Sequence, residues 1–182
     1  MLDRDAIYAV LRTVLDPEMP VNIVDLGIVA DVRLESGHGI AHGAAYVSVD
    51  VTPTFVGCPA LEMLAREIRD RLNELPDVLE TRVNFVNSPP WSVDCISPAG
   101  RAALQAHGVV VPDGPGAGSG AGARLTPLTV SAAAAQADDA PVRCPFCNSS
   151  ATELESRFGP TRCRMIYYCT ACRNSFERLK PI

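Results

Sequence analysis

The chain has 182 residues, 47% of them hydrophobic, and a formal net charge of −5. This length suits one ordinary domain plus a small one, and the negative charge argues against a nucleic-acid-binding surface, which is normally basic. No apolar run reaches the roughly 18 residues of a membrane span, and the N-terminus lacks the apolar core of a signal peptide. We therefore expect a cytoplasmic protein. In that reducing compartment its seven cysteines are expected to be metal ligands or reactive thiols rather than disulfides.

The first predicted element is an amphipathic helix over residues 3–15, because apolar residues recur there at the spacing of one helix face. Pro17 disfavours helical geometry at the residue before it, so we expect the helix to end at Asp16. A rigid acidic loop over 16–20 follows. Asp25-Leu26-Gly27 then leads into a strand with alternating apolar residues. The apolar residues of the helix are Ile7, Val10, Leu11, Val14 and Leu15, and those of the strand are Ile28, Ala30, Val32 and Leu34.

A glycine-rich connection over 36–43 joins this strand to a second one over 46–51. His38 and His42 lie in the connection at a spacing that would suit a metal on a helix, but the surrounding glycines argue against a helix. We interpret the two histidines as solvated turn residues.

The stretch that follows the second strand, residues 51–59, contains the first candidate site. Proline is favoured at the first position of a helix, so Pro59 predicts a helix start with Cys58 at the N-cap. Unpaired backbone N–H groups and the helix dipole favour negative charge there, which would favour the thiolate that binds metal or attacks an electrophile. The alternative is a buried cysteine that acts as a small apolar filler.

The remaining pattern of the N-terminal part is a second amphipathic helix over 61–75, a third strand over 81–86, and a short helix from Ser97-Pro98 to Gly108. Trp91 is expected to be a packing anchor and Cys95 a structural residue. The order of helix, two strands, helix and strand predicts an α/β (α+β) sandwich with helices on one side of a mixed sheet. We assign it to residues 1–108.

Residues 109–141 lose all periodicity and are rich in glycine, alanine and proline, so we predict a flexible linker. Residues 142–182 contain two Cys-x-x-Cys knuckles, Cys144–Cys147 and Cys169–Cys172. Four thiolates from two knuckles suit a closed tetrahedral zinc site, although residue type alone leaves iron open. Such a small zinc-ribbon domain is expected to need its metal for folding. Cys163 lies too far from Cys169 along an extended strand to join that site.

Three motifs in order resemble the SufT-like family of small α/β proteins implicated in iron–sulfur cluster assembly. They are Asp16-Pro17-Glu18-Met19-Pro20, Asp25-Leu26-Gly27 and Thr52-x-Thr54-x-x-Gly57-Cys58-Pro59. With Pro90-Trp91-Ser92-x-Asp94-x-Ile96-Ser97-x-x-Gly100-Arg101 and the five-cysteine tail, the whole chain resembles the PaaD (PaaJ) family. These proteins are accessory subunits of the phenylacetyl-CoA oxygenase (1,2-epoxidase) system of phenylacetate degradation. That subfamily usually has an aromatic residue at the position of Cys95, which argues against a ligand role for this cysteine.

The resemblance implies a non-catalytic accessory subunit that helps to deliver metal or an iron–sulfur cluster to oxygenase or reductase partners. It implies that Cys58 is the thiol that transiently holds iron or a cluster, with supporting groups nearby. These groups are Asp16, Glu18, Asp25, Thr52 and Thr54. The chain lacks the paired Glu-x-x-His helices of a di-iron site and any dinucleotide fingerprint.

Three alternatives remain open. The chain could be a structural docking subunit with no role in cluster handling, or a thiol-dependent enzyme that uses Cys58. The ribbon could also bind nucleic acid, because it is locally basic, but we interpret these residues as a solvated or protein-docking face. The basic residues of the ribbon are Arg157, Arg162, Arg164, Arg173, Arg178 and Lys180. The sequence also leaves open whether two chains pair to share a cluster.

Overall fold

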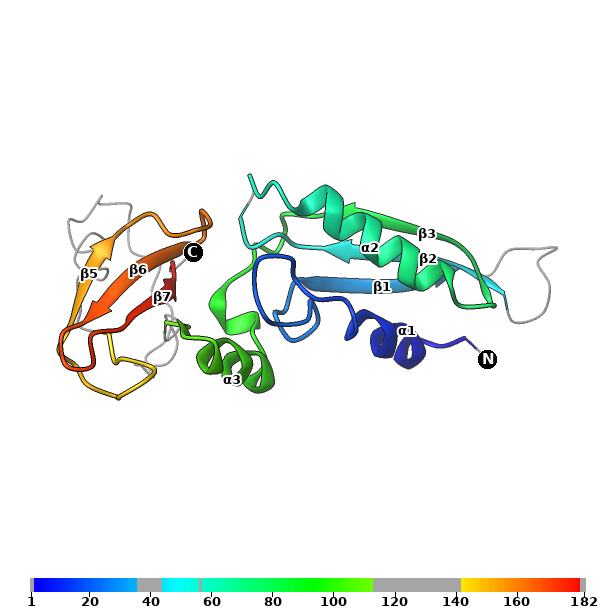
Figure 1. The fold of residues 1–182 in the computed structure, drawn as a ribbon. Helices are drawn as coiled ribbons and strands as arrows, with labels where there is room; N and C mark the ends of the chain where they lie inside the picture. Colours follow the sequence, from blue (N-terminus) through cyan, green and yellow to red (C-terminus); the bar gives the residue numbers. More distant parts are fainter. Residues whose placement is uncertain (1, 36–43, 56, 113–141, 181–182) are drawn as a thin grey trace, which may run out of the picture. The chain divides into compact units, whose positions relative to one another are not determined.

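The computed structural model describes residues 2–35, 44–55, 57–112 and 142–180 (Figure 1). His38, His42 and most of the predicted linker, residues 113–141, lie outside the described residues. The chain divides into two compact units, Met1–His107 and Gly108–Pro181.

The first unit has the predicted order of helix, two strands, helix and strand, followed by a 3-10 turn and a third helix (Figure 1). The mixed sheet has the order β1-β2-β3, with β1 antiparallel and β3 parallel to β2. The elements are α1 (Arg4–Leu11), β1 (Val29–Glu35), β2 (Ala45–Val51), α2 (Leu61–Asn73), β3 (Val78–Phe85), η1 (Val93–Cys95) and α3 (Pro98–Ala106).

Strand β2 shows why the helices lie on one face of this sheet. Val47, Val49 and Val51 are buried and alternate with more exposed residues, as a strand with one covered face requires. Helix α2 contacts β3, and α1 contacts both α2 and β1. The opposite face is polar, and there Arg33 forms two hydrogen bonds with the carboxylate of Asp50, of 2.6 and 2.8 Å. The predicted α/β sandwich on a mixed sheet is therefore confirmed.

The first helix is shorter than predicted. It ends at Leu11 with Arg12 as its C-cap, and not at Asp16. Val14 remains fully buried, but Leu15 is 62% exposed and forms an isolated bridge with Asn22. The chain leaves the helix because the backbone N–H of Ile23 donates to the carbonyl of Val14, so that long-range pairing replaces the last helical turn.

Strand β1 also departs from simple alternation. Its pairing with β2 shifts register between Val29 and Asp31, which leaves Ala30 exposed rather than on the apolar face. An extra residue of this kind is a β-bulge, and it increases the local twist of the strand. Ile28 and Val32 on either side of the bulge are buried as predicted.

The segment between β3 and α3 packs through its tryptophan. Trp91 is 5% exposed, and its indole N–H donates to the carbonyl of Leu26 at 3.0 Å, which confirms it as an anchor. Helix α3 begins as predicted, with Ser97 as a side-chain N-cap followed by proline at the first helical position. Gly108, at φ +77°, follows the helix end, where a left-handed residue is typical.

The second unit is a small sheet with the order β4-β7-β6-β5. Strands β5, β6 and β7 are labelled in Figure 1. Strand β4 occupies the first two residues of the range that we assigned to the linker and pairs with β7. The small core contains only a few side chains. The strands are β4 (Val109–Val110), β5 (Thr152–Ser156), β6 (Arg164–Cys169) and β7 (Ser175–Leu179). The core residues are Cys144, Met165, Tyr167, Cys169 and Phe176.

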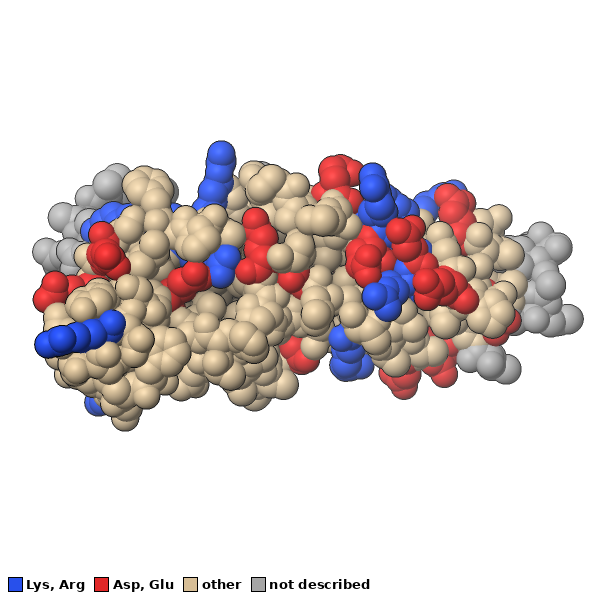
Figure 2. Space-filling model, in the orientation of Figure 1, with Lys and Arg blue, Asp and Glu red and all other residues tan. Residues whose placement is uncertain are grey.

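Charged residues of both signs are interspersed over α2 in the view of Figure 2. A single-sign basic field, which nucleic-acid binding would favour, is absent from the described residues of that face. None of the helices in the described part of the chain is long and apolar enough to cross a membrane.

Candidate functional site

The two Cys-x-x-Cys knuckles have the same local structure. The backbone N–H of Asn148 donates to Cys144 at 2.9 Å, and that of Arg173 donates to Cys169 at 2.8 Å. Asn148 and Arg173 both have positive φ, 59° and 61°, the left-handed conformation that closes a tight turn. Each knuckle is thus folded by its own backbone so that both of its thiols point inward.

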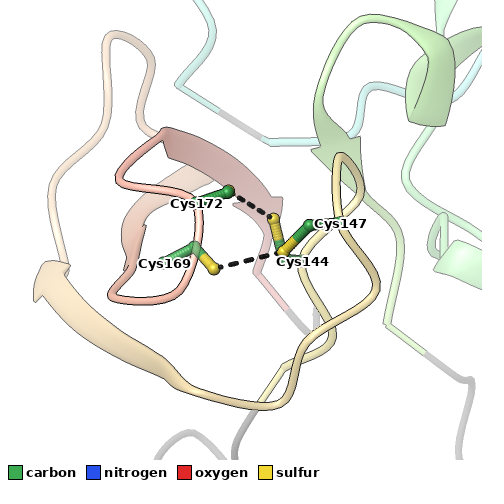
Figure 3. A group of neighbouring side chains, drawn as sticks. All are labelled: Cys144, Cys147, Cys169 and Cys172. Atoms are coloured by element: carbon green, nitrogen blue, oxygen red, sulfur yellow. Dashed lines mark hydrogen bonds between the residues drawn. The ribbon is translucent and has the colours of Figure 1, made fainter.

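The four knuckle thiols converge on one point (Figure 3). All four sulfur atoms lie within 4.8 Å of one another, and two pairs, Cys144–Cys172 and Cys147–Cys169, are 3.6 Å apart. Tetrahedral zinc with Zn–S bonds of about 2.3 Å needs sulfur atoms about 3.8 Å apart. The donor set and its spacing therefore fit a structural zinc ion, as the sequence predicts.

The protonation of these thiols shows how strongly they interact. Hydrogen bonds from the side chain and backbone of Asn174 lower the pKa of Cys172 to about 6. A backbone hydrogen bond at Ser149 lowers the pKa of Cys147, but desolvation and the other three thiols outweigh it and raise that pKa to about 12. Four thiolates this close repel one another, and a divalent cation is the group that removes the repulsion.

Cys163 and Cys95, which the sequence analysis left out of the zinc site, lie outside this cluster. Cys163 is buried, and its sulfur lies 3.2 Å from the hydroxyl of Thr161. Cys95 is exposed at the end of η1, and its backbone carbonyl packs so closely on Gly27 that a Cβ there would lie 2.1 Å from it. Neither is among the four clustered thiols.

The loop that contains Cys58 differs from the prediction in one respect. Helix α2 begins at Leu61 with Ala60 as its N-cap, so Cys58 lies two residues before the cap and not at it. The backbone N–H of Cys58 donates to the carbonyl of Phe55 at 3.1 Å, which closes a turn ahead of the helix. The prediction from Pro59 was wrong because this turn, and not the proline, fixes where the helix begins.

Cys58 nevertheless lines a pocket, and two of the residues expected near it line the same pocket. Asp16 comes from the loop after α1 and Thr54 from the loop after β2. The cavity volume is about 10 Å³, room for about one water molecule. The remaining lining is mostly apolar. Sequence periodicity predicted Ile28, Leu61 and Leu64 as apolar residues of a strand and a helix, but it did not bring them together with Pro53 and Ala60 at one pocket. The other residues of the lining are Ile28, Pro53, Ala60, Leu61 and Leu64.

The orientation of Asp16 is fixed by its own loop. Its Oδ1 accepts hydrogen bonds from the backbone N–H groups of Glu18 and Met19, both at 2.9 Å. Its backbone N–H donates to Val21. The acidic Asp-Pro-Glu-Met-Pro loop therefore holds one carboxylate at the pocket through backbone bonds, and Glu18 contributes its N–H to this arrangement.

Asp25 and Thr52 are absent from the described pocket lining. The Asp25 carboxylate accepts hydrogen bonds from Ser97 and Asn22, both at 2.6 Å, and these bonds hold its pKa below the usual range. Thr52 is buried, and its backbone N–H donates to the carbonyl of Ile28, a residue of the pocket wall. Asp25 thus holds the N-cap of α3, and Thr52 holds the wall.

A larger apolar groove adjoins the cysteine pocket and shares Leu64 with it. Its volume is about 240 Å³, and it lies between the loop after α1 and one face of α2. Leu15 and Met63, 62% and 59% exposed, line it together with Thr13, Pro17, Leu64, Glu67 and Arg71.

Comparison with known proteins assigns a class to each part of the chain. The family described as "Iron-sulfur cluster assembly protein" matches residues 4–85, and the "PaaD zinc beta ribbon domain" matches residues 129–180. The chain therefore joins an iron–sulfur cluster assembly domain to a zinc β-ribbon, and its four clustered cysteines are the metal-binding group of that ribbon.

The chain is 35% identical over 177 residues to an Escherichia coli (strain K12) protein that is named as a subunit of 1,2-phenylacetyl-CoA epoxidase. The alignment covers 97% of this chain and 92% of that protein. It belongs to this family of PaaD-type epoxidase subunits. It is also 36% identical over 101 residues to the "Fe-S protein maturation auxiliary factor YitW" of Bacillus subtilis, covering 56% of this chain and 92% of that protein.

Among solved structures, a DUF59 domain from Bacillus anthracis aligns with a TM-score of 0.47 and 34% identity over 55% of this chain and 89% of that chain.

Proposed function

We propose that this chain is a non-catalytic accessory subunit of a phenylacetyl-CoA epoxidase system, acting in the cytoplasm to hold iron or an iron–sulfur cluster at Cys58 and deliver it to an oxygenase or reductase subunit. The observation that carries the proposal is the pocket that both Cys58 and Asp16 line. The family match over almost the whole chain supports the pathway. The names of the shorter relatives, which are maturation factors, support the cluster handling.

The size of the pocket limits how the cargo is held. About 10 Å³ accommodates one small atom and not a cluster. The cargo would therefore lie at the pocket mouth, with Cys58 as one terminal ligand and further ligands supplied by the receiving protein or by a second copy of this chain. Incomplete ligation of this kind suits transfer, because the cargo leaves when a partner offers a fuller set of thiolates.

The supporting residues would then have distinct tasks. Asp16, which lines the same pocket as Cys58, would accept a proton from the thiol or contact a cation. Thr54 lines the pocket, and Thr52 holds the strand pairing beneath it. Glu18 would act through its backbone N–H, by orienting Asp16, and Asp25 through its carboxylate, by fixing α3.

The test is to replace Cys58 by serine in a cell that depends on the epoxidase for growth on phenylacetate. Cys95→Ser is the matched control, because Cys95 is also accessible but lies outside the pocket. We expect Cys58→Ser to lower the iron content and activity of the epoxidase while the variant protein keeps its zinc, and Cys95→Ser to leave both unchanged.

The second candidate is a structural docking subunit with no cluster-handling role. The apolar groove beside the pocket, with exposed Leu15 and Met63, favours it, because exposed apolar surface of this kind suits protein contacts. Full epoxidase activity with Cys58→Ser, and stable stoichiometric co-purification, would select this candidate.

A further inference from the structure

The turn between β5 and β6, residues 157–162, displays a phenylalanine almost entirely in solvent. Phe158 is 80% exposed, more than any other large apolar side chain in the described part of the chain. Exposing a phenylalanine ring is unfavourable in water, so burying this ring against a partner would be favourable.

The backbone of this turn is closed by several hydrogen bonds. The hydroxyl of Ser156 accepts from the N–H of Phe158 at 3.0 Å and donates to its carbonyl at 2.9 Å. The N–H of Gly159 donates to the carbonyl of Arg164 at 3.0 Å. A Cβ at position 159 would lie 2.9 Å from that same carbonyl, so the close approach requires glycine.

A partly buried ion pair supports the turn, with the Arg164 side chain 9% exposed and the Glu177 side chain 26% exposed. The guanidinium of Arg164, a 7% exposed residue, donates to Glu177 at 2.5 Å and to the hydroxyl of Thr161 at 2.8 Å. Burying the charge of Arg164 is costly unless the charge is paired. Here the pair fixes the geometry of a turn whose exposed ring contributes little to the core. The ring is therefore presented by a preorganised turn.

Positively charged residues belong to the same turn or lie close to the exposed ring. The ammonium nitrogen of Lys180 lies 5.5 Å from the centroid of the Phe158 ring. Arg157 and Arg162 occupy the same turn and are exposed. Residues 142–180 contain seven Lys or Arg against three Asp or Glu, a net charge of +4, while residues 1–107 contain eight against fifteen, a net charge of −7. The basic character of the chain is thus confined to the ribbon.

We propose that Arg157, Phe158, Arg162 and Lys180, here called the ribbon tip, dock onto an acidic surface of a partner protein that has an apolar pocket for the Phe158 ring. An aromatic anchor surrounded by arginine is the composition of an interface hot spot. Complementary charge would increase the rate of encounter. This proposal rests on the proposed function in one respect, because it takes the partner to be another subunit of the epoxidase system.

The experiment uses the tagged full-length chain co-expressed with the remaining subunits of the epoxidase system from the same genome. Co-purified subunits are quantified at low and at high salt. Phe158→Ser removes the anchor of the ribbon tip, and Arg162→Glu reverses one of its charges. Phe146→Ser is the control, because this phenylalanine is also in the ribbon and 54% exposed but lies in the first knuckle. Zinc content shows that each variant keeps its fold.

We expect Phe158→Ser to reduce the amount of co-purified partner by about tenfold or more, as loss of a hot-spot residue does. Arg162→Glu should have a comparable effect that is strongest at low salt, and Phe146→Ser should have none. Cys58→Ser should co-purify like the wild type, so this assay is separate from the test of cluster handling.

Three results would overturn the proposal. The first is no co-purification by the wild type, and the second is unchanged co-purification by both ribbon-tip variants. The third is a zinc-loaded chain whose ribbon tip instead binds DNA or RNA at physiological salt. In each case the response of epoxidase activity to Cys58→Ser would still decide the proposed function independently.

Discussion

Replacing Asp25 by alanine tests whether this residue acts mainly through α3. The change removes two hydrogen bonds to a carboxylate, from Ser97 and Asn22, each of 2.6 Å. Hydrogen bonds to charged groups contribute about 1.5–3 kcal/mol each when both partners remain folded. Because the site is only partly buried and the two bonds share one carboxylate, we expect the free energy of unfolding to fall by about 2–4 kcal/mol.

Trp91 makes this effect easy to follow. It is the only tryptophan, it is buried, and its indole bonds to Leu26, the neighbour of Asp25. Its fluorescence during urea denaturation therefore reports the unfolding of the first unit. Ser97→Ala gives the matched partner variant, and the double variant should be less destabilised than the sum of the two single ones, because the two residues share a hydrogen bond.

The same residue predicts a pH dependence. The folded-state pKa of Asp25 is lowered from the ordinary value of 3.8, by the hydrogen bond from Ser97 and then by that from Asn22. Its stabilising contribution is thus complete above pH 3.8 and is lost as the pH falls through the folded-state pKa. Asp25→Ala should show a weaker loss of stability in that acidic range. An Asp25→Ala protein of unchanged stability but without accessory activity would refute this reasoning and place Asp25 functionally at the cysteine pocket.

Three further predictions concern stability and metal. Gly27→Ala should lower the free energy of unfolding by at least about 2 kcal/mol in the same urea denaturation. The reason is that Gly27 has φ +74° and that a Cβ there would lie 2.1 Å from the carbonyl of Cys95. An unchanged midpoint would show that this contact relaxes easily. Thr81→Val should leave the free energy of unfolding unchanged or raise it by about 1 kcal/mol, because the buried hydroxyl of Thr81 has no hydrogen-bond partner among the described residues. A clear loss of stability would reveal a partner. A chelator should unfold the ribbon, because Cys144 and Cys169 are both zinc ligands and core residues. The near-ultraviolet circular dichroism of Tyr167 should then be lost while the Trp91 fluorescence persists. Simultaneous loss of both signals would show that the two units unfold together.

Sequence patterns predicted the parts of this protein in which one local rule decides the outcome. The alternation of Val47, Val49 and Val51 specifies the buried face of β2 because a strand has a period of two. The spacing of the two knuckles specifies the four zinc ligands because a tetrahedral site needs two converging pairs of thiols.

The predictions failed where a long-range contact competes with a local signal. Leu15 continues the apolar stripe of the first helix, but the bond between Ile23 and Val14 ends that stripe early. Pro59 is a good helix start, but the turn closed by Cys58 and Phe55 delays the helix to Leu61. No pattern along the chain shows that Asp25 bonds to a serine 72 positions away.

The unequal burial of the four zinc ligands has a consequence for metal exchange. Cys144 and Cys169 are buried in the ribbon core, whereas Cys147 is exposed and Cys172 half-buried. A competing ligand therefore has access to the metal from one side only, and the exposed Cys147 is the bond it would displace first. Without that bond, Cys144, Cys169 and Cys172 would still hold the ion. Exchange of a bound ion would thus begin at Cys147, at a rate that depends on what covers this residue.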